Sequence, residues 1–402
     1  MRFGRFILVM AVCVMAALGG PASAADGWDK TLSSARGKEV YWNAWAGDPS
    51  VNAYIAWVAD EVRRRFDITL HHVKIGDTAE AVSRVLAEAA AGRKVGGSVD
   101  LIWINGENFL ALKESGLLYG PFAQSLPNYS LVDTEAKPTT RIDATVPTEG
   151  YESPWGSAQF VMIVDSARVQ MPPAGVAELL AWAQANPGRL TYPLPPDFIG
   201  TTFLKQALYE LNPESLTILQ QPLDGADFET VTAPLWAYLD ALHPHLWRAG
   251  KGFPRNGPAA RRLIADGEAD IAFSFQPSEA SAAIAQGLLP ETARTAAFAA
   301  GSIGNSHFLA IPANASQPEA ALVVADFLLS PEAQARKQDP GVWGDFTVLA
   351  LRRLDPADRE RFESLPLGPA TLPPDKLGPT FPEPHPSWTV RMEQEWQRRY
   401  GR

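Results

Sequence analysis

The segment that follows the amino-terminal leader alternates short apolar strands with amphipathic helices. Residues 39–46 (EVYWNAWA) are rich in β-favouring side chains, and residues 49–66 carry apolar side chains at helical spacing. A second strand is predicted over residues 68–75, and residues 99–104 (VDLIWI) form a strand that is apolar on both sides. Strands that are buried on both faces and separated by helices are typical of a parallel sheet in an α/β fold.

A near-repeat extends this pattern to the second half of the chain. GSVDLIWIN at 97–105 and GEADIAFSF at 267–275 each place an Asp three residues after a Gly, followed by an apolar strand and then a helix ending in Gly-Leu-Leu. Ligands of open α/β sheets bind beyond the carboxyl ends of strands. The repeat therefore predicts two lobes whose ligand-facing ends lie near Asn105 and Phe275.

The amino terminus predicts export. Within residues 1–24, two arginines precede an apolar run over 6–18, and Ala-Ser-Ala at 22–24 has the small side chains that signal peptidase needs. An uncleaved membrane anchor is the alternative, but the run is short for a bilayer span. We expect a soluble periplasmic protein, and because the single cysteine, Cys13, is removed, it has neither a disulfide nor a lipid anchor.

The length of the chain indicates how many lobes it forms, and its net charge indicates which classes of partner it does not bind. Cleavage leaves 378 residues (402 − 24), more than one hydrophobic core usually supports, so two lobes are expected. The formal charge of −10 becomes −12 (−10 − 2) once both leader arginines are removed. Such a surface repels nucleic acid and anionic lipid. We expect a monomer that binds no nucleic acid.

The order of the predicted elements suggests how the two lobes share the chain. Residues 25–156 and 301–345 are assigned to the first lobe, and residues 157–300 and 346–402 to the second. The chain leaves the first lobe near Gly156 and returns near Gly301. Two crossing segments of this kind form a hinge.

Three segments carry a family resemblance that covers almost the whole exported chain. They are GEADIAFSF, the stretch from 302 to 334, and PLPPDFIGTTFLKQAL at 193–208. The sequence resembles the periplasmic solute-binding proteins of ATP-driven importers, in particular the YnjB-type subgroup, and is distantly similar to thiamine-binding proteins. The resemblance implies a two-lobed, type II-like α/β fold that closes on a solute and delivers it to an inner-membrane ABC permease, without a cofactor.

Aromatic, acidic and polar residues cluster at the predicted cleft ends. Aromatic faces attract cations, and a carboxylate adds charge-assisted hydrogen bonds, so a flat, thiamine-like cation suits this set. Sugars, polyamines and oxyanions remain alternative ligands. On the alternative interpretation, many of the tryptophans pack in the protein interior and do not bind the ligand. The predicted ligand-binding residues are Trp45, Asp48, Asn105, Glu107, Trp155, Asp197, Thr201, Thr202, Phe275, Gln276, Ser278, Trp343 and Asp345.

The sequence contains few motifs that would indicate a metal site or a catalytic site. His71 and His72 point to opposite faces of a predicted strand, and His243 and His245 lack a third ligand nearby. The adjacent tyrosines used by iron-binding relatives are missing from the sequence, and it has no nucleophile elbow or phosphate loop. The alternative function is a secreted glycoside hydrolase with Glu107 and Glu279 as its acid and base.

The leader makes the first prediction. Amino-terminal sequencing of protein recovered from the periplasm should begin at Ala25, or within a few residues of it, because signal peptidase cleaves after small side chains. Recovery only as a full-length, membrane-bound chain would contradict export with cleavage.

Overall fold

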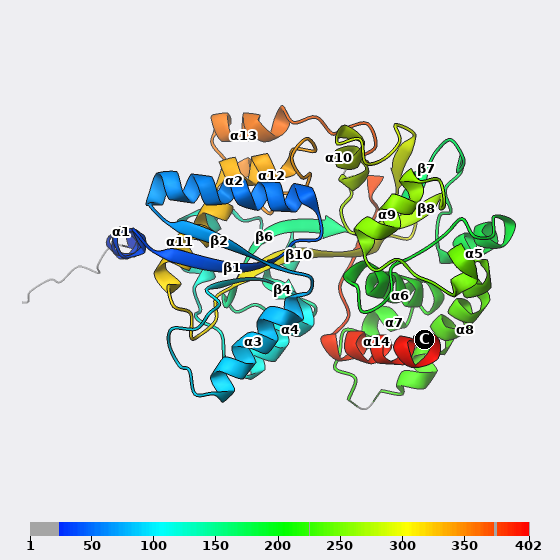
Figure 1. Ribbon diagram of the computed structural model, residues 1–402, viewed down its shortest axis with the longest axis horizontal. Coiled ribbons are helices and arrows are strands. Elements are labelled where there is room, and N and C mark those ends of the chain that lie inside the picture. The colour runs from blue at the N-terminus through cyan, green and yellow to red at the C-terminus, as the bar shows by residue number, and fades with distance from the viewer. Residues whose placement is uncertain (1–23, 225, 374–375, 402) are drawn as a thin grey trace, which may run out of the picture.

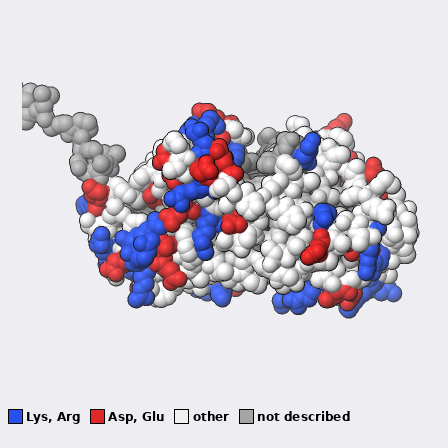
Figure 2. Space-filling view, turned by 90° about the horizontal axis from the view of Figure 1, so that it is seen from above, with Lys and Arg blue, Asp and Glu red and all other residues white. Residues whose placement is uncertain are grey.

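The computed structural model describes residues 24–224, 226–373 and 376–401, and consists of two α/β lobes side by side (Figure 1). The predicted leader lies outside the described residues, apart from its last position. None of the described helices is long and apolar enough to cross a membrane. In a view from above, Lys and Arg are interspersed with Asp and Glu over the first lobe, whereas much of the second lobe's face is uncharged (Figure 2).

The first lobe contains a six-stranded mixed sheet. β1 (Glu39–Trp45) pairs in parallel with β2 (Thr69–Ile75) and β3 (Leu101–Ile104), as the sequence pattern predicts. β10 (Ser302–Ala310) then runs antiparallel to both β3 and β6 (Glu152–Gln159), and the short β11 (Thr380–Phe381) pairs with its beginning.

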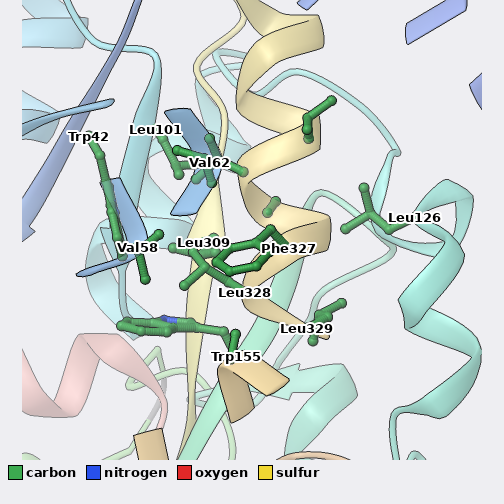
Figure 3. Packing of buried hydrophobic residues seen from close by; sticks show 14 of the residues in the cluster. Trp42, Val58, Val62, Leu101, Leu126, Trp155, Leu309, Phe327, Leu328 and Leu329 are labelled. Atoms are coloured by element: carbon green, nitrogen blue, oxygen red, sulfur yellow. The ribbon is translucent and has the colours of Figure 1, made fainter. Parts of the chain in front are cut away.

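Helices cover both faces of this sheet. One face packs on α1 (Ala24–Ala35), α2 (Pro49–Phe66), α11 (Pro318–Leu328) and α12 (Pro331–Gln338), and the other on α3 (Thr78–Ala90) and α4 (Gly106–Glu114). Trp42 and Leu309 of the sheet meet Val58 of α2 and Phe327 of α11 in the core (Figure 3). α2 begins where Asp48 accepts a hydrogen bond from the Ser50 amide, and Ser330 caps α12 in the same way.

The second lobe is built on a smaller, three-stranded sheet. β7 (Val161–Asp165) lies between β8 (Ile271–Ser274) and β9 (Ala293–Ala296) and is antiparallel to both. Its helices are α5 (Val176–Ala185), α6 (Phe198–Leu211), α7 (Ser215–Ile218), α8 (Phe228–Leu242), α9 (Gly257–Ala265), α10 (Glu279–Ala285) and the carboxyl-terminal α14 (Pro386–Tyr400).

Three connections join the lobes: the two predicted at the hinge and a third in the carboxyl-terminal part of the chain. The first is Phe160, which separates β6 from β7 and donates its amide hydrogen to Ile303 O at 2.8 Å. The second precedes β10, and the third is the carboxyl-terminal segment, where Ser302 donates to Pro379 O at 3.0 Å. β6 and β10 thus carry the chain between the lobes (Figure 1).

The hydrophobic cores divide the last sixty residues differently from the expected boundary at residue 346. Leu349, Leu354 and Phe362 belong to the core of the first lobe, and α13 (Pro356–Glu363) packs on α12. Ala370 belongs to a core cluster of the second lobe. The chain therefore crosses between Phe362 and Ala370, because its apolar side chains up to residue 362 are buried against the first lobe.

Gly156 lies on β6 at a point where no side chain fits. A Cβ at this position would overlap Asp345 Oδ2 and would lie 2.6 Å from His307 Cδ2 and 3.0 Å from Lys337 Nζ. Asp345 and Lys337 have no exposed side-chain surface and form an ion pair. The glycine lets the crossing strand run directly past this buried ion pair.

Replacing Gly156 by Ala should destabilise the protein by about 1–3 kcal/mol, the usual cost of forcing an added carbon into a packed interior. Denaturant unfolding measures this difference. Gly27→Ala is the matched control, because Gly27 lies in α1 with nothing within 4 Å of an added Cβ. Equal stability of the Gly156 variant and the control would contradict this account of the crossing strand.

Candidate functional site

The carboxyl ends of the first lobe's strands face the second lobe, and side chains on both sides meet across the cleft. Arg261 of α9 donates to Asp48 Oδ2 at 3.1 Å and also pairs with Glu279 of α10. Gln286 donates to Ser50 Oγ at 2.7 Å. The amino-terminal end of α2 is thereby joined to α9 and α10, which lie beside it in Figure 1.

Loop contacts extend this interlobe seam. Gln276 donates its side-chain amide to Gly344 O at 2.8 Å, and the Ser278 hydroxyl donates to the same carbonyl. Arg261 is 8% exposed, so its ion pairs are largely shielded from water. The structure is therefore a closed form on this side of the cleft.

Acidic side chains gather on the other side of the cleft, between α4, α6 and α14. Thr201 donates to Glu393 Oε1 at 2.7 Å, and Lys205 pairs with Glu383. Burial raises the pKa of Glu393 to about 7, and burial also raises the pKa of Glu107. Glu393 is therefore poised to change charge near neutral pH.

A strained hairpin adds Asp143 to this acidic cluster. β4 (Ile142–Asp143) and β5 (Val146–Pro147) are joined by Ala144 and Thr145, whose φ angles of 41° and 73° lie in the left-handed region. The Ala144 methyl packs so closely on Gly106 that a Cβ there would lie 2.6 Å away. Asp143 is 2% exposed, and burial, with Glu107 nearby, raises its pKa well above the usual range.

Indole rings and a buried charge network form the inner wall of the cleft near the hinge. The ring centroids of Trp103 and Trp155 are 4.9 Å apart, and those of Trp155 and Trp343 are 5.5 Å apart. Asp345 accepts from His307 at 2.9 Å and pairs with Lys337. Although burial opposes ionisation, these two partners hold the pKa of Asp345 below its usual value.

Several predicted ligand-binding residues have structural roles in this closed form. Trp155 has no exposed surface, Trp343 is 8% exposed, and Phe275 packs on Phe160 and Phe198. Thr202 donates to Phe198 O, and Asn105 accepts from the side chain of Asn108. These contacts favour packing or local hydrogen bonding for the five predicted residues Trp155, Thr202, Trp343, Phe275 and Asn105.

At the start of α6, the predicted ligand-binding residue Asp197 caps the helix. Asp197 accepts hydrogen bonds from the amides of Ile199 and Gly200 at 3.0 and 3.3 Å. Its carboxylate already occupies the positive end of the helix dipole, and burial raises its pKa to about 6. A solute anion would therefore meet a like charge at this helix.

Trp45, Asp48 and Glu107 retain the strongest case among the predicted residues. Trp45 and Glu107 are half-buried on loops or helix starts that follow β1 and β3, and Asp48 takes part in the interlobe ion pair. Two surface hollows lie elsewhere; the larger, about 580 Å³, is lined by Tyr41 and Asp100 at the amino-terminal half of β1.

Sequence reasoning missed four charged residues that form the cleft: Lys205, Arg261, Glu383 and Glu393. A lysine within the apolar stretch FIGTTFLKQAL was a usable signal, because a buried lysine needs an acidic partner. That partner, Glu383, is 178 residues away, so no local pattern could identify it. Among the described residues, no group of three His, Cys, Asp or Glu side chains could hold a metal ion.

Both the sequence and the fold of this chain match known solute-binding proteins. The family of bacterial extracellular solute-binding proteins matches residues 57–349. The chain belongs to this family. It is also 47% identical to protein YnjB of Escherichia coli strain K12 over 380 residues, which cover 94% of this chain and 95% of that protein.

Solved structures agree on the fold. The fructose-6-phosphate-bound periplasmic binding protein AfuA from Actinobacillus pleuropneumoniae matches with a TM-score of 0.64 and 14% identity, over 90% of this chain and 99% of its own. Iron-bound HitA from Pseudomonas aeruginosa matches with a TM-score of 0.59 and 16% identity, over 89% and 98%. The chain is thus a two-lobed member of the bacterial extracellular solute-binding proteins.

The acid and base expected for a hydrolase do not form a catalytic pair here. Glu279 is held by Arg261 and by the Ser274 hydroxyl. Glu107 lies instead near Lys205 and Glu383 of the second lobe. Burial has the largest effect on the pKa of Glu107, and the charges of these two residues also influence it. The family and the relatives named above are solute-binding proteins.

Replacing Arg261 by Met should shift the protein towards an open form. Removing one partner from a buried ion pair costs roughly 3–5 kcal/mol. The closed form bears the part of this cost that falls on Asp48, because opening returns Asp48 to water, whereas Glu279 lies in the same lobe as Arg261. Small-angle scattering of the ligand-free variant should show a larger radius of gyration than the parent protein.

Arg262→Met is the matched control, because Arg262 is the exposed neighbour of Arg261 on the same helix. It should leave the scattering unchanged. If both variants scatter like the parent protein, the ion pair across the cleft does not hold the lobes together.

Proposed function

We propose that this receptor acts in the periplasm after cleavage of its leader, and that its solute is a small organic cation of thiamine-like type. Closure of the two lobes captures the cation, and the closed form delivers it to an inner-membrane ABC permease. The solute leaves unchanged, because the receptor performs no chemistry on it.

The acidic cluster between the lobes carries this proposal. Glu107 of α4 lies close enough to Asp143 of the strained hairpin, and to Glu393 of α14, to raise the pKa of each. Lys205, the positive group beside them, is already paired with Glu383. A cation entering this space gains charge-assisted hydrogen bonds, whereas an anion would be repelled.

The aromatic wall suits the flat part of such a solute. Trp45 and Trp103 are half-buried, and Trp103 stands edge-on to the fully buried Trp155. Their accessible faces can attract a cationic ring by about 0.5–2 kcal/mol. Trp155 and Trp343 then support these rings from behind instead of touching the solute.

Calorimetric titration with thiamine tests the proposal. Glu107→Gln should weaken binding by about 2–3 kcal/mol, because a desolvated cation loses a charged partner. Trp45→Leu should cost about 0.5–2 kcal/mol, because it removes the negative ring face but keeps apolar area. Fructose, as a neutral sugar, and a polyamine complete the panel; tight fructose binding that is insensitive to Glu107→Gln would contradict a cationic solute.

The same titration should depend on pH. Thiamine keeps its positive charge, whereas Glu393, with a pKa of about 7, and Asp197, with a pKa of about 6, gain protons as the pH falls. Affinity should therefore be highest near pH 8 and decrease towards pH 6. A receptor for a neutral sugar would show a flat profile over this range.

A further inference from the structure

The buried pair formed by Lys205 and Glu383 faces the cleft from the second lobe. The two side chains are 4% and 6% exposed. Lys205 also lies 5.5 Å above the ring of Phe198, at the start of the same helix. Buried charges of this kind are strongly unfavourable without a partner, so each residue depends on the other.

The carboxyl-terminal segment holds Glu383 in place. β11 pairs with β10 just before it, and the His385 amide donates to Leu219 O at 2.7 Å just after it. Tyr209 donates its hydroxyl to Pro382 O at 3.0 Å, and Asn305 donates to Glu383 Oε1 at 3.3 Å. Glu383 is therefore fixed from both the hinge strand and α6.

Acceptor atoms without donors lie close to this pair. Among the described residues, Asp143 Oδ2 and Asn305 Oδ1 are buried and have no hydrogen-bond partner. Asp143 responds electrostatically to both Glu383 and Lys205, so these groups share one region. Buried acceptors without a donor are rare, and a positively charged ligand group would satisfy them.

We propose that Glu383 sets the charge selectivity of the cleft. By pairing with Lys205 it cancels the positive charge there, which leaves Glu107, Asp143 and Glu393 to recognise a cationic group on the solute. This inference rests on the proposed cationic solute. Glu383 is a positioning residue, because it acts through Lys205.

The position of these residues in the chain supports the proposal. The family match ends at residue 349, whereas Glu383 and Glu393 lie beyond it on β11–α14. α14 packs against both α6 and α4, so the segment reaches both lobes. The segment carries Glu383 and Glu393 and also adds Trp388, Met392 and Trp396 to the core of the second lobe.

Binding assays with two charged probes test the inference. In Glu383→Gln, Lys205 becomes an uncompensated cation inside the cleft, so thiamine affinity should fall by roughly tenfold or more. Fructose-6-phosphate, as an anionic probe, should bind more tightly than to the parent protein. Glu214→Gln, at an exposed position of the same lobe, should change neither affinity.

The double variant Lys205→Met, Glu383→Met keeps the net charge and the apolar volume, and it guards against loss of folding. It should bind thiamine within about threefold of the parent protein, since the cluster of three acids is intact. A folded Glu383→Gln protein that binds both probes like the parent protein would overturn the proposal.

A measurement on the ligand-free protein distinguishes failure of this inference from failure of the proposed function. Thr201, Lys205, Glu107 and Asp77 face Glu393, and carbon-13 NMR can follow its titration in the ligand-free protein. Glu383→Gln should lower the pKa of Glu393 below about 7, because Lys205 then acts on it uncompensated. If the pKa of Glu393 shifts but thiamine does not bind, only the proposed solute is rejected. An unchanged pKa of Glu393 would overturn the role of Glu383.

Discussion

The pairing of β6 with β10 is the interaction on which the remaining structure depends. β10 is antiparallel to β6 along most of its length, joins β3 at its end and meets β11 at its beginning. The positions of both lobes and of the carboxyl-terminal segment therefore depend on their contacts with the single strand β10. Its side chains reach the buried charges as well, because His307 contacts Asp345 and Asn305 contacts Glu383. Lobe closure and cleft charge are set by the same few residues.

Buried charges are treated in two different ways near this hinge. Asp345 has both Lys337 and His307 as partners, and they hold its pKa below the usual value. Asp143 and Glu152 instead keep carboxylate oxygens without hydrogen-bond partners, and burial raises the pKa of each. An uncompensated acid is neutral until a cation approaches. The contrast separates a structural ion pair from acids that respond to a ligand.

Local patterns in the sequence predicted the parts of the fold that depend on local chemistry. The parallel strands β1 to β3 follow from the alternation of apolar strands and amphipathic helices in the sequence. The division between β6 and β7 at Phe160 depends instead on tertiary pairing, which turns the chain into the other lobe. Trp155 was assigned to the ligand from its position at the predicted crossover between the lobes, but its burial depends on rings from distant segments. Lys205 and Glu383 likewise meet only in three dimensions.

Related folds bind solutes of different chemistry, so individual side chains and not the fold set the charge of the cleft. AfuA was solved with a sugar phosphate and HitA with iron, and both match this chain over about nine-tenths of its length. A fold that accommodates such different solutes does not itself fix the sign of the charge that it accepts. That sign depends on the side chains that each member carries in its cleft. In this chain the irregular segment after residue 349 returns to the hinge, so a change of two acids there can alter selectivity while both cores remain intact.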